Sequence, residues 1–351
     1  MCDDHGHHAH VPAIETDIPR EEWRGEVLPL EPVDGVSILT VCDNTVDMLL
    51  LDEGPARRMP IGGEPTRVLP APTVIDGKVP DAPLAQHGFS ALVTVRKGER
   101  EHRILFDTGI TPDGCVENLA RFDIHPGDIE VVVCSHGHFD HTVGLSGLAD
   151  RLGRTGMPVL LHPEFWTQRR LNIPGRDPIE LPTTSRRGLE EAHFDIVENR
   201  QPSFLFERSV LITGEVDRTT SFETGFALHE ARRNDHWEPD PLILDDQALI
   251  LNVRDRGLVV LTGCGHAGVV NIVRYAQRLT GVDRIHMLMG GFHLNGPLFE
   301  PLIAPTCEAL EAIGPATIVP AHCTGWKAQH ALAARIPDAF IQGSVGTTYE
   351  L

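Results

Sequence analysis

The feature that most constrains this chain is a short run of ligand-type residues that directly follows an apolar segment. Three histidines and one aspartate fall within six positions, at His136, His138, Asp140 and His141. The preceding residues 129–133 are rich in β-branched side chains, which is typical of a buried strand. Zinc, iron and manganese all accept imidazole and carboxylate ligands. The sequence therefore predicts a metal site at the end of a buried strand.

The spacing within the run suits two metal ions rather than one. Residues two apart in an extended chain point to the same side, so His136 and His138 suit a first ion. Asp140 and His141 are adjacent and diverge, so they suit a second ion beside the first. Gly137 permits a tight turn between ligands. The alternative is a polar loop whose histidines face water, and the dense spacing of four ligand-type residues argues against it.

Composition limits the classes of function. The chain has 351 residues, with 30 basic against 50 acidic side chains and a formal net charge of −20. No stripe of basic residues offsets this charge, which argues against a nucleic-acid partner and favours a small-molecule substrate. No apolar run approaches the roughly 18 residues of a membrane span, and the acidic N-terminus is unlike a secretory signal. We therefore expect no membrane partner, and the sequence does not indicate an oligomeric state.

The cysteines show no disulfide framework. There are seven of them, an odd number, and their spacings contain no Cys-x-x-Cys pair. We therefore expect free thiols and a reducing compartment, the cytoplasm.

The remaining segments predict one domain over residues 35–351. Residues 1–34 are expected to form a flexible lead whose His-rich tract binds metal only loosely. That tract consists of His5, His7, His8 and His10. Two stretches with little regular pattern, near residues 52–83 and 163–240, are expected to be insertions that shape the substrate pocket.

Strands followed by histidines recur in the second half of the chain. Residues 257–261, 285–289 and 316–319 have the pattern of strands, and each precedes a segment with a histidine: His266, His293 and His322. Helices are predicted over residues 269–279 and 305–313. Strand ends are where α/β proteins place their chemistry. We therefore expect these histidines to lie near the run at 136–141.

Each of these residues also has a structural alternative. His266 has glycines on both sides, so the backbone can approach a metal, and we favour it as a ligand. His322 is either a ligand or a buried structural histidine. His293 is a ligand, a proton donor or a substrate contact. Cys264 is either a metal-bound thiolate or an inert buried thiol, because zinc lowers the pKa of a bound thiol.

Three further polar residues at strand ends have open roles. Asp107 lies just before a Thr-Gly turn. It is either an ordinary turn aspartate or an acceptor of hydrogen bonds, from loop N–H groups or from a residue that binds the metal. His162 either faces the site or is structural. Glu215 is more simply explained as a solvated loop carboxylate than as a ligand.

The run His-x-His-x-Asp-His resembles the signature of the metallo-β-lactamase superfamily. The segments Gly-Cys-Gly-His-Ala-Gly, Gly-Gly-Phe-His-Leu and His-Cys-Thr-Gly are similar to one branch in particular, the metal-dependent hydrolases of β-lactamase superfamily II. Many members of that branch carry the name 7,8-dihydropterin-6-methyl-4-(β-D-ribofuranosyl)aminobenzene-5′-phosphate synthase. The resemblance covers most of the chain from about residue 35. It implies an α/β fold, the four-layer αββα sandwich, with metals at one edge.

The resemblance also implies roles for the candidate residues. Asp107 would lie under the metal site and orient its ligands. The first metal would be held by His136, His138 and His266. The second would be held by Asp140, His141 and His322. The chain departs from the common pattern because Cys264 stands where many members have a bridging aspartate. It also has no Pro-Gly-His segment between residues 200 and 246, so His266 would replace that ligand.

These residues lead to a functional hypothesis with two alternatives. We expect a hydrolase with two zinc ions, or iron or manganese, in which a metal-bound hydroxide attacks an ester, lactone or phosphoester. Asp140 and His293 are the expected catalytic residues. The first alternative is C–N bond formation on a phosphorylated pterin precursor, which the branch name suggests. The second is a non-enzymatic metal-binding sensor that uses the His-rich N-terminus as an accessory.

Overall fold

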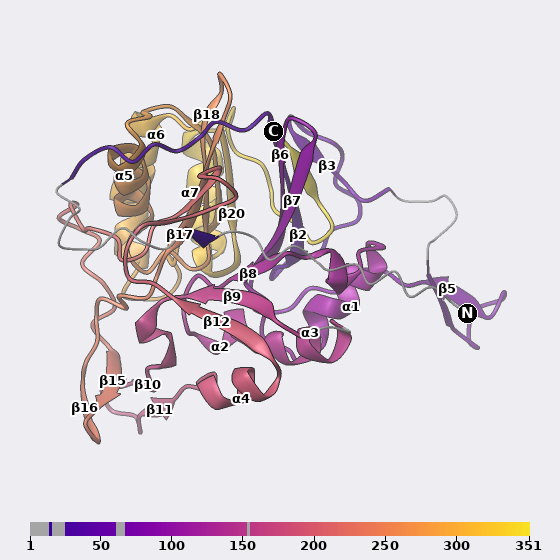
Figure 1. Cartoon of the computed structure of the whole chain (residues 1–351), viewed down its shortest axis with the longest axis horizontal. Coiled ribbons are helices and arrows are strands. Elements are labelled where there is room, and N and C mark those ends of the chain that lie inside the picture. The colour runs from indigo at the N-terminus through magenta and orange to yellow at the C-terminus, as the bar shows by residue number, and fades with distance from the viewer. Residues whose placement is uncertain (1–13, 16–24, 61–66, 153–154) are drawn as a thin grey trace, which may run out of the picture.

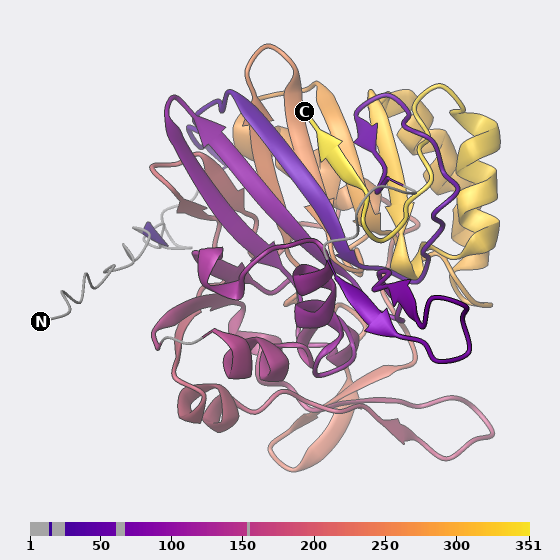
Figure 2. The same cartoon turned by 90° about the vertical axis from the view of Figure 1, so that its right-hand side faces the viewer.

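A computed structural model describes residues 14–15, 25–60, 67–152 and 155–351 of the chain. Two large mixed β-sheets lie at its centre, and helices cover their outer faces (Figures 1 and 2). The eight-stranded sheet contains, in spatial order, β12 (Phe194–Glu198), β9 (Met157–Leu161), β8 (Val131–Val133), β7 (Arg100–Phe106), β6 (Ser90–Lys97), β2 (Gly35–Cys42), β21 (Thr348–Glu350) and β3 (Ala56–Arg57). Its strands are parallel from β12 to β7 and antiparallel from β7 to β3.

The second sheet has seven strands and is parallel only at one side. In spatial order it contains β1 (Ile14–Glu15), β13 (Ser203–Leu205), β14 (Val210–Ile212), β17 (Ala248–Val253), β18 (Gly257–Thr262), β19 (Ile285–Gly291) and β20 (Thr317–Ala321). The parallel strands are β18, β19 and β20. The loops after these three strands therefore leave the sheet at one edge.

Side chains that alternate between the two faces of each sheet form one core between the sheets and one core under the helices on each side. In β6, Val93 and Val95 face the core between the sheets, whereas Leu92 belongs to the core under the helices. In β17, Leu249 faces the inner core and Ile250 the outer one. Successive side chains of a strand point to opposite faces, so a strand buried on both faces reads as a continuous apolar run. This explains why these segments could be recognised as strands from their composition.

The helices complete the outer layers. Those on the seven-stranded sheet are α5 (Val269–Thr280), α6 (Ile303–Ile313) and α7 (Trp326–Arg335), whose apolar side chains share one core with that sheet. Those near the other sheet are α1 (Gly114–Arg121), α2 (Phe139–Thr142), α3 (Leu145–Arg151) and α4 (Arg186–Glu191). The described residues also form short 3-10 turns next to strands or helices: η1 (Pro126–Asp128), η2 (Pro163–Trp166), η3 (Glu300–Leu302) and η4 (His322–Thr324). The predicted four-layer αββα sandwich is therefore confirmed.

Two stretches expected to be irregular contain small sheets. Within residues 163–240 lies a four-stranded sheet of β11 (Ile179–Glu180), β10 (Arg169–Leu171), β15 (His229–Arg233) and β16 (His236–Pro239), which extends to the lower left in Figure 1. Within residues 52–83 lies the hairpin of β4 (Val68–Pro70) and β5 (Lys78–Pro80), which projects on the right. Short strands with exposed residues leave no apolar pattern, so the sequence did not indicate them.

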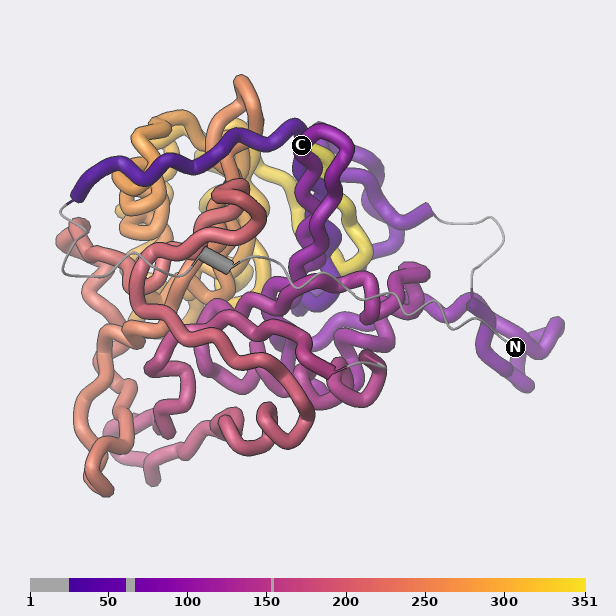
Figure 3. The backbone as a smooth tube through the Cα atoms, in the orientation of Figure 1, coloured from indigo at the N-terminus to yellow at the C-terminus, as the bar shows by residue number. Residues whose placement is uncertain are grey.

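The expected flexible lead also differs from the structure. Residues 25–34 lie along the body, as the indigo tube of Figure 3 shows. Leu28, Leu30 and Val33 are buried, and the N–H groups of Leu28 and Val33 donate to backbone oxygens of α5 and β17. The packed fold thus begins before residue 35. The His-rich tract at residues 5–10 lies outside the described residues. None of the helices in the described ranges combines the length and apolar character that a membrane crossing requires.

We predict that Gly144→Ala destabilises the fold where α3 meets the end of β7. A Cβ atom at Gly144 would lie 2.0 Å from the carbonyl oxygen of Thr108, and a backbone atom cannot move aside cheaply. We expect the free energy of unfolding to fall by about 1–3 kcal/mol in urea denaturation, as for other overpacked sites. Gly188→Ala within α4 is the control, because its Cβ would meet Ser185 at an ordinary 3.4 Å. Equal stability of the two variants would contradict the prediction.

Candidate metal centre

The candidate centre lies where loops from both large sheets meet. The run at residues 134–141 follows β8, Asp107 follows β7, and Cys264 and His266 follow β18. His293 follows β19, and His322 begins η4 directly after β20. The structure therefore brings the predicted strand-end residues of the two halves of the chain to one place.

One group of candidate ligands consists of His136, His138 and His266. The Nδ1 atom of His138 lies 3.0 Å from Nε2 of His136 and 3.1 Å from Nε2 of His266. All three rings are buried, and burial lowers the pKa of each well below its ordinary value, with neighbouring histidines adding to the effect. The rings are therefore neutral, and three ring nitrogens converge on one point.

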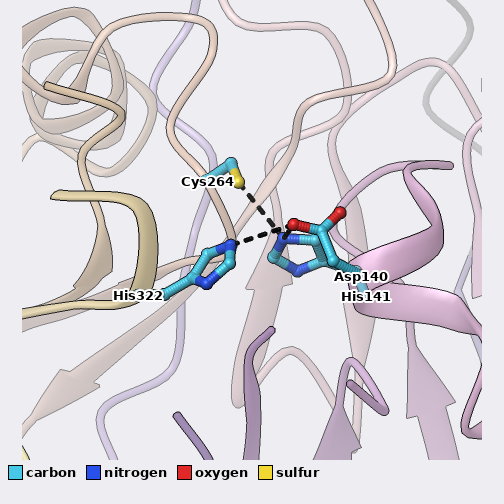
Figure 4. A group of neighbouring side chains, drawn as sticks. All are labelled: Asp140, His141, Cys264 and His322. Atoms are coloured by element: carbon cyan, nitrogen blue, oxygen red, sulfur yellow. Dashed lines mark hydrogen bonds and ion pairs between the residues drawn. The ribbon is translucent and has the colours of Figure 1, made fainter. Parts of the chain in front are cut away.

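A second group consists of Asp140, His141, Cys264 and His322, drawn in Figure 4. The Nε2 atom of His141 lies 3.1 Å from the Cys264 sulfur and 3.9 Å from Oδ2 of Asp140. The same carboxylate oxygen lies 3.3 Å from Nε2 of His322. Although burial opposes ionisation, His141 and His322 hold the pKa of Asp140 well below its usual range. Asp140 is therefore an ionised carboxylate among nitrogen and sulfur atoms.

The carboxylate of Asp107 sets the proton positions of two candidate ligands. It accepts from Nδ1 of His141 at 2.7 Å. Although burial opposes the charge, Asp107 and Asp140 raise the pKa of His141 to about 9, so a metal ion would replace the second proton of this ring, on Nε2. It also accepts from the Ser135 hydroxyl at 2.7 Å, so the Ser135 oxygen accepts from Nδ1 of His136 at 2.9 Å. His136 therefore also directs an Nε2 lone pair into its group. Of the two interpretations left open by the sequence, the structure supports a hydrogen-bonding role for Asp107.

Asn44 acts on His322 in the same way. Its Oδ1 atom lies 3.1 Å from Nδ1 of His322, and its amide nitrogen lies 3.3 Å from the His322 carbonyl oxygen. With Nδ1 donating to Asn44, the Nε2 atom of His322 is an acceptor that faces the Asp140 carboxylate. Within the described residues this buried Nε2 atom has no hydrogen-bond donor. Acceptor atoms that face one another in both groups fit divalent cations, which would supply the missing positive charge.

A cavity of about 260 Å³ opens above the two groups. Asp140, Cys264, His266, His293 and His322 all contribute to its wall. Four lining residues come from the segment expected to shape the pocket, namely Leu171, Leu181, Phe226 and His229. No described residue of 52–83 lines this cavity. The structure thus links the 163–240 segment, and not the described part of the 52–83 segment, to this space.

His293 lies in an aromatic wall beside the first group. Its ring centroid is 4.2 Å from that of His266 and 4.5 Å from that of Phe299. Its backbone φ of 44° is in the left-handed region, as are those of Asp107 and His322 at 58° and 47°. Strained non-glycine residues of this kind cluster at functional sites. His293 is therefore held in place to face the cavity.

Two open candidates lie away from the cavity lining. The Nε2 atom of His162 is 3.4 Å from Glu215, and its Nδ1 atom accepts from the Glu164 N–H at the start of η2. Glu215 also pairs with Arg200 at 2.8 Å. The structural interpretation of His162 therefore describes it better, and Glu215 belongs to an ion pair rather than to the candidate ligand groups.

Sequence reasoning missed several residues at the site. His87 lies 3.7 Å from Asp140, and Nε2 of His229 lies 3.0 Å from Nε2 of His138. Asn44 followed the same strand-end rule as the other residues, because it comes just after β2, and that signal was available. His229 begins a short strand in the small sheet, and its partner is 91 positions away, so no local pattern marked it.

A four-layer sandwich with two adjoining groups of buried ligand-type side chains at one edge defines a metal-dependent enzyme. The sequence model of the Metallo-beta-lactamase superfamily matches residues 87–277, and this chain belongs to that superfamily. The family predicted from the His-x-His-x-Asp-His run is thus confirmed.

Individual relatives agree with this family. A 7,8-dihydropterin-6-methyl-4-(beta-D-ribofuranosyl)-aminobenzene-5'-phosphate synthase of Methanocaldococcus jannaschii is 28% identical over 266 residues, which cover 73% of this chain and 87% of the relative. The Metallo-beta-lactamase domain-containing protein 1 of Rattus norvegicus is 35% identical over 127 residues, which cover 34% of this chain and 49% of that protein. The crystal structure of Tm1679, a metal-dependent hydrolase of the beta-lactamase superfamily, superposes with a TM-score of 0.65 at 24% identity. That match covers 90% of this chain and 98% of Tm1679.

We predict that Asp107→Asn weakens metal binding without unfolding the protein. Asparagine tolerates the left-handed backbone, but its amide group would face the N–H of His141 or force that ring to change tautomer. We expect metal affinity to fall by about 10–100-fold in competition with a chelator. Asp123→Asn is the matched control, because Asp123 has a similar φ of 59° after α1, away from the site. An unchanged affinity in Asp107→Asn would contradict this role.

Proposed function

We propose that this chain is a metal-dependent hydrolase that cleaves an ester, lactone or phosphoester bond in a small molecule. The observation that supports it is that two adjoining groups of lone-pair donors border one cavity, the first through His138 and His266 and the second through Asp140, Cys264 and His322. In this proposal the first ion is held by His136, His138 and His266. The second is held by Asp140, His141, Cys264 and His322. Zinc is the proposed metal, and iron or manganese also suit these ligands.

A bound pair of divalent cations supplies a polarising charge for the scissile group and a water of lowered pKa. The side chains of the chain supply the remaining parts. The low pKa of Asp140 favours a role as an anionic ligand and hydrogen-bond acceptor over that of a base. His293 borders the cavity, and its buried Nδ1 atom has no partner within the described residues, so its ring can donate a proton to a leaving group or bind a substrate oxygen.

The charge of the cavity wall supports an uncharged substrate. Neither lysine nor arginine is among the described residues that line it. The metals would therefore be the cations that bind a negative group there, and a second anionic group would meet no positive side chain. Leu171, Leu181 and Phe226 give the wall an apolar part. An ester or lactone suits this wall better than a molecule with an additional phosphate inside the cavity.

The second candidate is C–N bond formation of the kind named for the M. jannaschii synthase. Its support is the 28% identity over 87% of that relative. Incubation with dihydropterin diphosphate and the ribofuranosyl aminobenzene phosphate would separate the two candidates, because only a synthase forms the condensation product. Absence of that product, with multiple turnover on an ester panel, would reject both the synthase and the metal-sensor alternatives.

The test of the proposed hydrolase uses metal-depleted protein reconstituted with zinc, manganese or iron. Elemental analysis of the purified protein identifies the resident metal, and a panel of esters, lactones and phosphodiesters measures turnover. We expect multiple turnover that a chelator abolishes and metal restores. Failure on every substrate class of the panel would overturn the proposal. We also propose a cytoplasmic setting, which the free cysteines of the described residues support, five of them buried.

We predict that His138→Ala loses metal and turnover together. His138 presents Nδ1 to both other rings of the first group, so its removal leaves that group with two nitrogens. We expect a loss of activity of at least about 100-fold, more than removal of a residue behind a ligand causes. His330→Ala on α7 is the control, because its side chain is exposed. Retention of metal and turnover by His138→Ala would end the proposal.

We predict a different result for His293→Gln. His293 lines the cavity, and its ring lies near Cys264 and His266, with which it forms a third group of ligand-type atoms within 4.8 Å of one another. Our assignment places the metals in the two other groups, so we expect both to stay bound. Turnover should fall by about 100-fold or more if the ring transfers a proton, because general acids typically contribute that much. Elemental analysis and kcat for the same preparation measure the two quantities. Loss of metal would instead show that His293 is a ligand.

A further inference from the structure

The ring of His138 has one nitrogen, Nε2, that points away from the candidate metal position. This atom faces His229, a histidine to which the proposed function gives no role. Nε2 of His138 lies 3.0 Å from Nε2 of His229, the first residue of β15 in the small four-stranded sheet. His229 is fully buried. A ring on a separate sheet thus lies directly beside the first group of candidate ligands, at the cavity wall.

The direction of the hydrogen bond follows from the inner side of His138. Its Nδ1 atom faces the Nε2 atoms of His136 and His266, so as a ligand His138 carries its lone pair on Nδ1. A neutral imidazole has one proton, which then lies on Nε2 and is donated to His229. His229 in turn carries its own proton on Nδ1, the atom that lies 3.9 Å from Oδ2 of Asp240. His229 is therefore the hydrogen-bond acceptor for His138.

Buried ion pairs hold His229 at this position. The Asp240 N–H donates to the His229 carbonyl oxygen at 2.9 Å, and the Asp240 carboxylate accepts from Nε of Arg169 at 3.1 Å. Arg169 lies on β10, the strand next to β15, and is buried. Arg169 and Asp240 are thus buried and paired with each other, whereas the rings of His138 and His229 lie at the cavity wall. Within the described residues Nδ1 of His229 makes no hydrogen bond, and the Asp240 carboxylate 3.9 Å away is the charge that faces it.

The same arginine reaches the other side of the metal-binding run. Its second guanidinium nitrogen donates to Oδ2 of Asp245 at 3.0 Å, and this oxygen accepts from the Gly137 N–H at 2.8 Å. Gly137 lies between His136 and His138. The small sheet therefore contacts residues 134–141 at two neighbouring points. His229 contacts the ring of His138, and Arg169 contacts the backbone N–H of Gly137 through Asp245.

We propose that His229 is a positioning residue for the first metal and that, through it, the small four-stranded sheet becomes part of the metal centre. Hydrogen bonds to the outer nitrogen of a ligand histidine fix its tautomer and orientation and raise its basicity. His229 supplies this bond where a carboxylate or backbone carbonyl is usual. The inference rests on the proposed assignment of His138 as a ligand, and it does not depend on the reaction.

The test measures metal affinity and not turnover. His229→Phe keeps a ring but removes the acceptor, and His229→Gln restores an acceptor through its amide oxygen. His236→Phe on β16 is the matched control, because His236 belongs to the same sheet and is exposed. Each variant is titrated with zinc against a chelator, and its cobalt-substituted form is examined by absorption spectroscopy, which reports on the ligand geometry of the metal.

We expect His229→Phe to bind one of its two ions about 10–100-fold more weakly and to show an altered cobalt spectrum. The affinity of His229→Phe for the second ion should stay within a few-fold of that of the original protein. The affinities of His229→Gln and His236→Phe for both ions should do the same. Equal affinities and spectra for His229→Phe and the original protein would overturn the inference. So would a loss in His229→Gln as large as that in His229→Phe.

A second measurement holds even if His229→Phe does not fold. Nitrogen-15 NMR of the zinc-loaded original protein distinguishes protonated, free and metal-bound ring nitrogens. We expect a protonated Nε2 and a metal-bound Nδ1 in His138, and a protonated Nδ1 in His229. A metal bound to Nε2 of His138 would overturn the inference. Protein that binds two zinc ions but hydrolyses no substrate would contradict the proposed reaction only, and this inference would still hold.

Discussion

The structure of the site depends on one buried carboxylate, that of Asp107. It follows β7 of one sheet, has no exposed surface and accepts three hydrogen bonds, from the Ser135 N–H, the Ser135 hydroxyl and the His141 ring. An acceptor with this many donors fixes the direction of each. Because Ser135 then accepts from His136, a single group directs one lone pair into each of the two candidate metal groups. A residue outside the candidate ligands, Asp107, therefore determines which ring nitrogens of His136 and His141 carry protons.

Close approach of the two sheets is the second requirement. Cys264 and His266 come from the seven-stranded sheet, while His136, His138 and His141 come from the eight-stranded one. Gly263 lies where a Cβ atom would come within 2.0 Å of the Ser135 hydroxyl. A larger residue there would push the loop after β18 away from the loop after β8. The apolar core between the sheets sets their separation, and glycine at this contact lets the ligand loops meet across it.

Prediction from the sequence succeeded where the signal is local. Segments such as 257–261 and 285–289 are apolar because both faces of their strands are buried, so composition identified them. The run of candidate ligands was recognisable because its four members fall within six positions. His229 and Arg169 were not, since each acts through a partner some 76 to 91 positions away, and neither lies in a pattern that spacing could reveal. Residues 25–34 were expected to be flexible, but they pack on the body through Leu28, Leu30 and Val33. These three apolar residues have no helical or strand periodicity, so the sequence did not indicate their burial.

The sequence alone determined the strands and the run of candidate ligands, because strand patterns and ligand spacing are properties of neighbouring positions. The family and the sandwich followed from the resemblance of that run to a known superfamily signature. Only the tertiary structure placed Cys264 in the group of Asp140, His141 and His322, since Cys264 and His141 meet through loops of two different sheets. It also decided the proton positions, which depend on Asp107 and Asn44, and the place of the small sheet beside His138. Contacts between distant segments depend on three-dimensional packing, and no spacing along the chain encodes them.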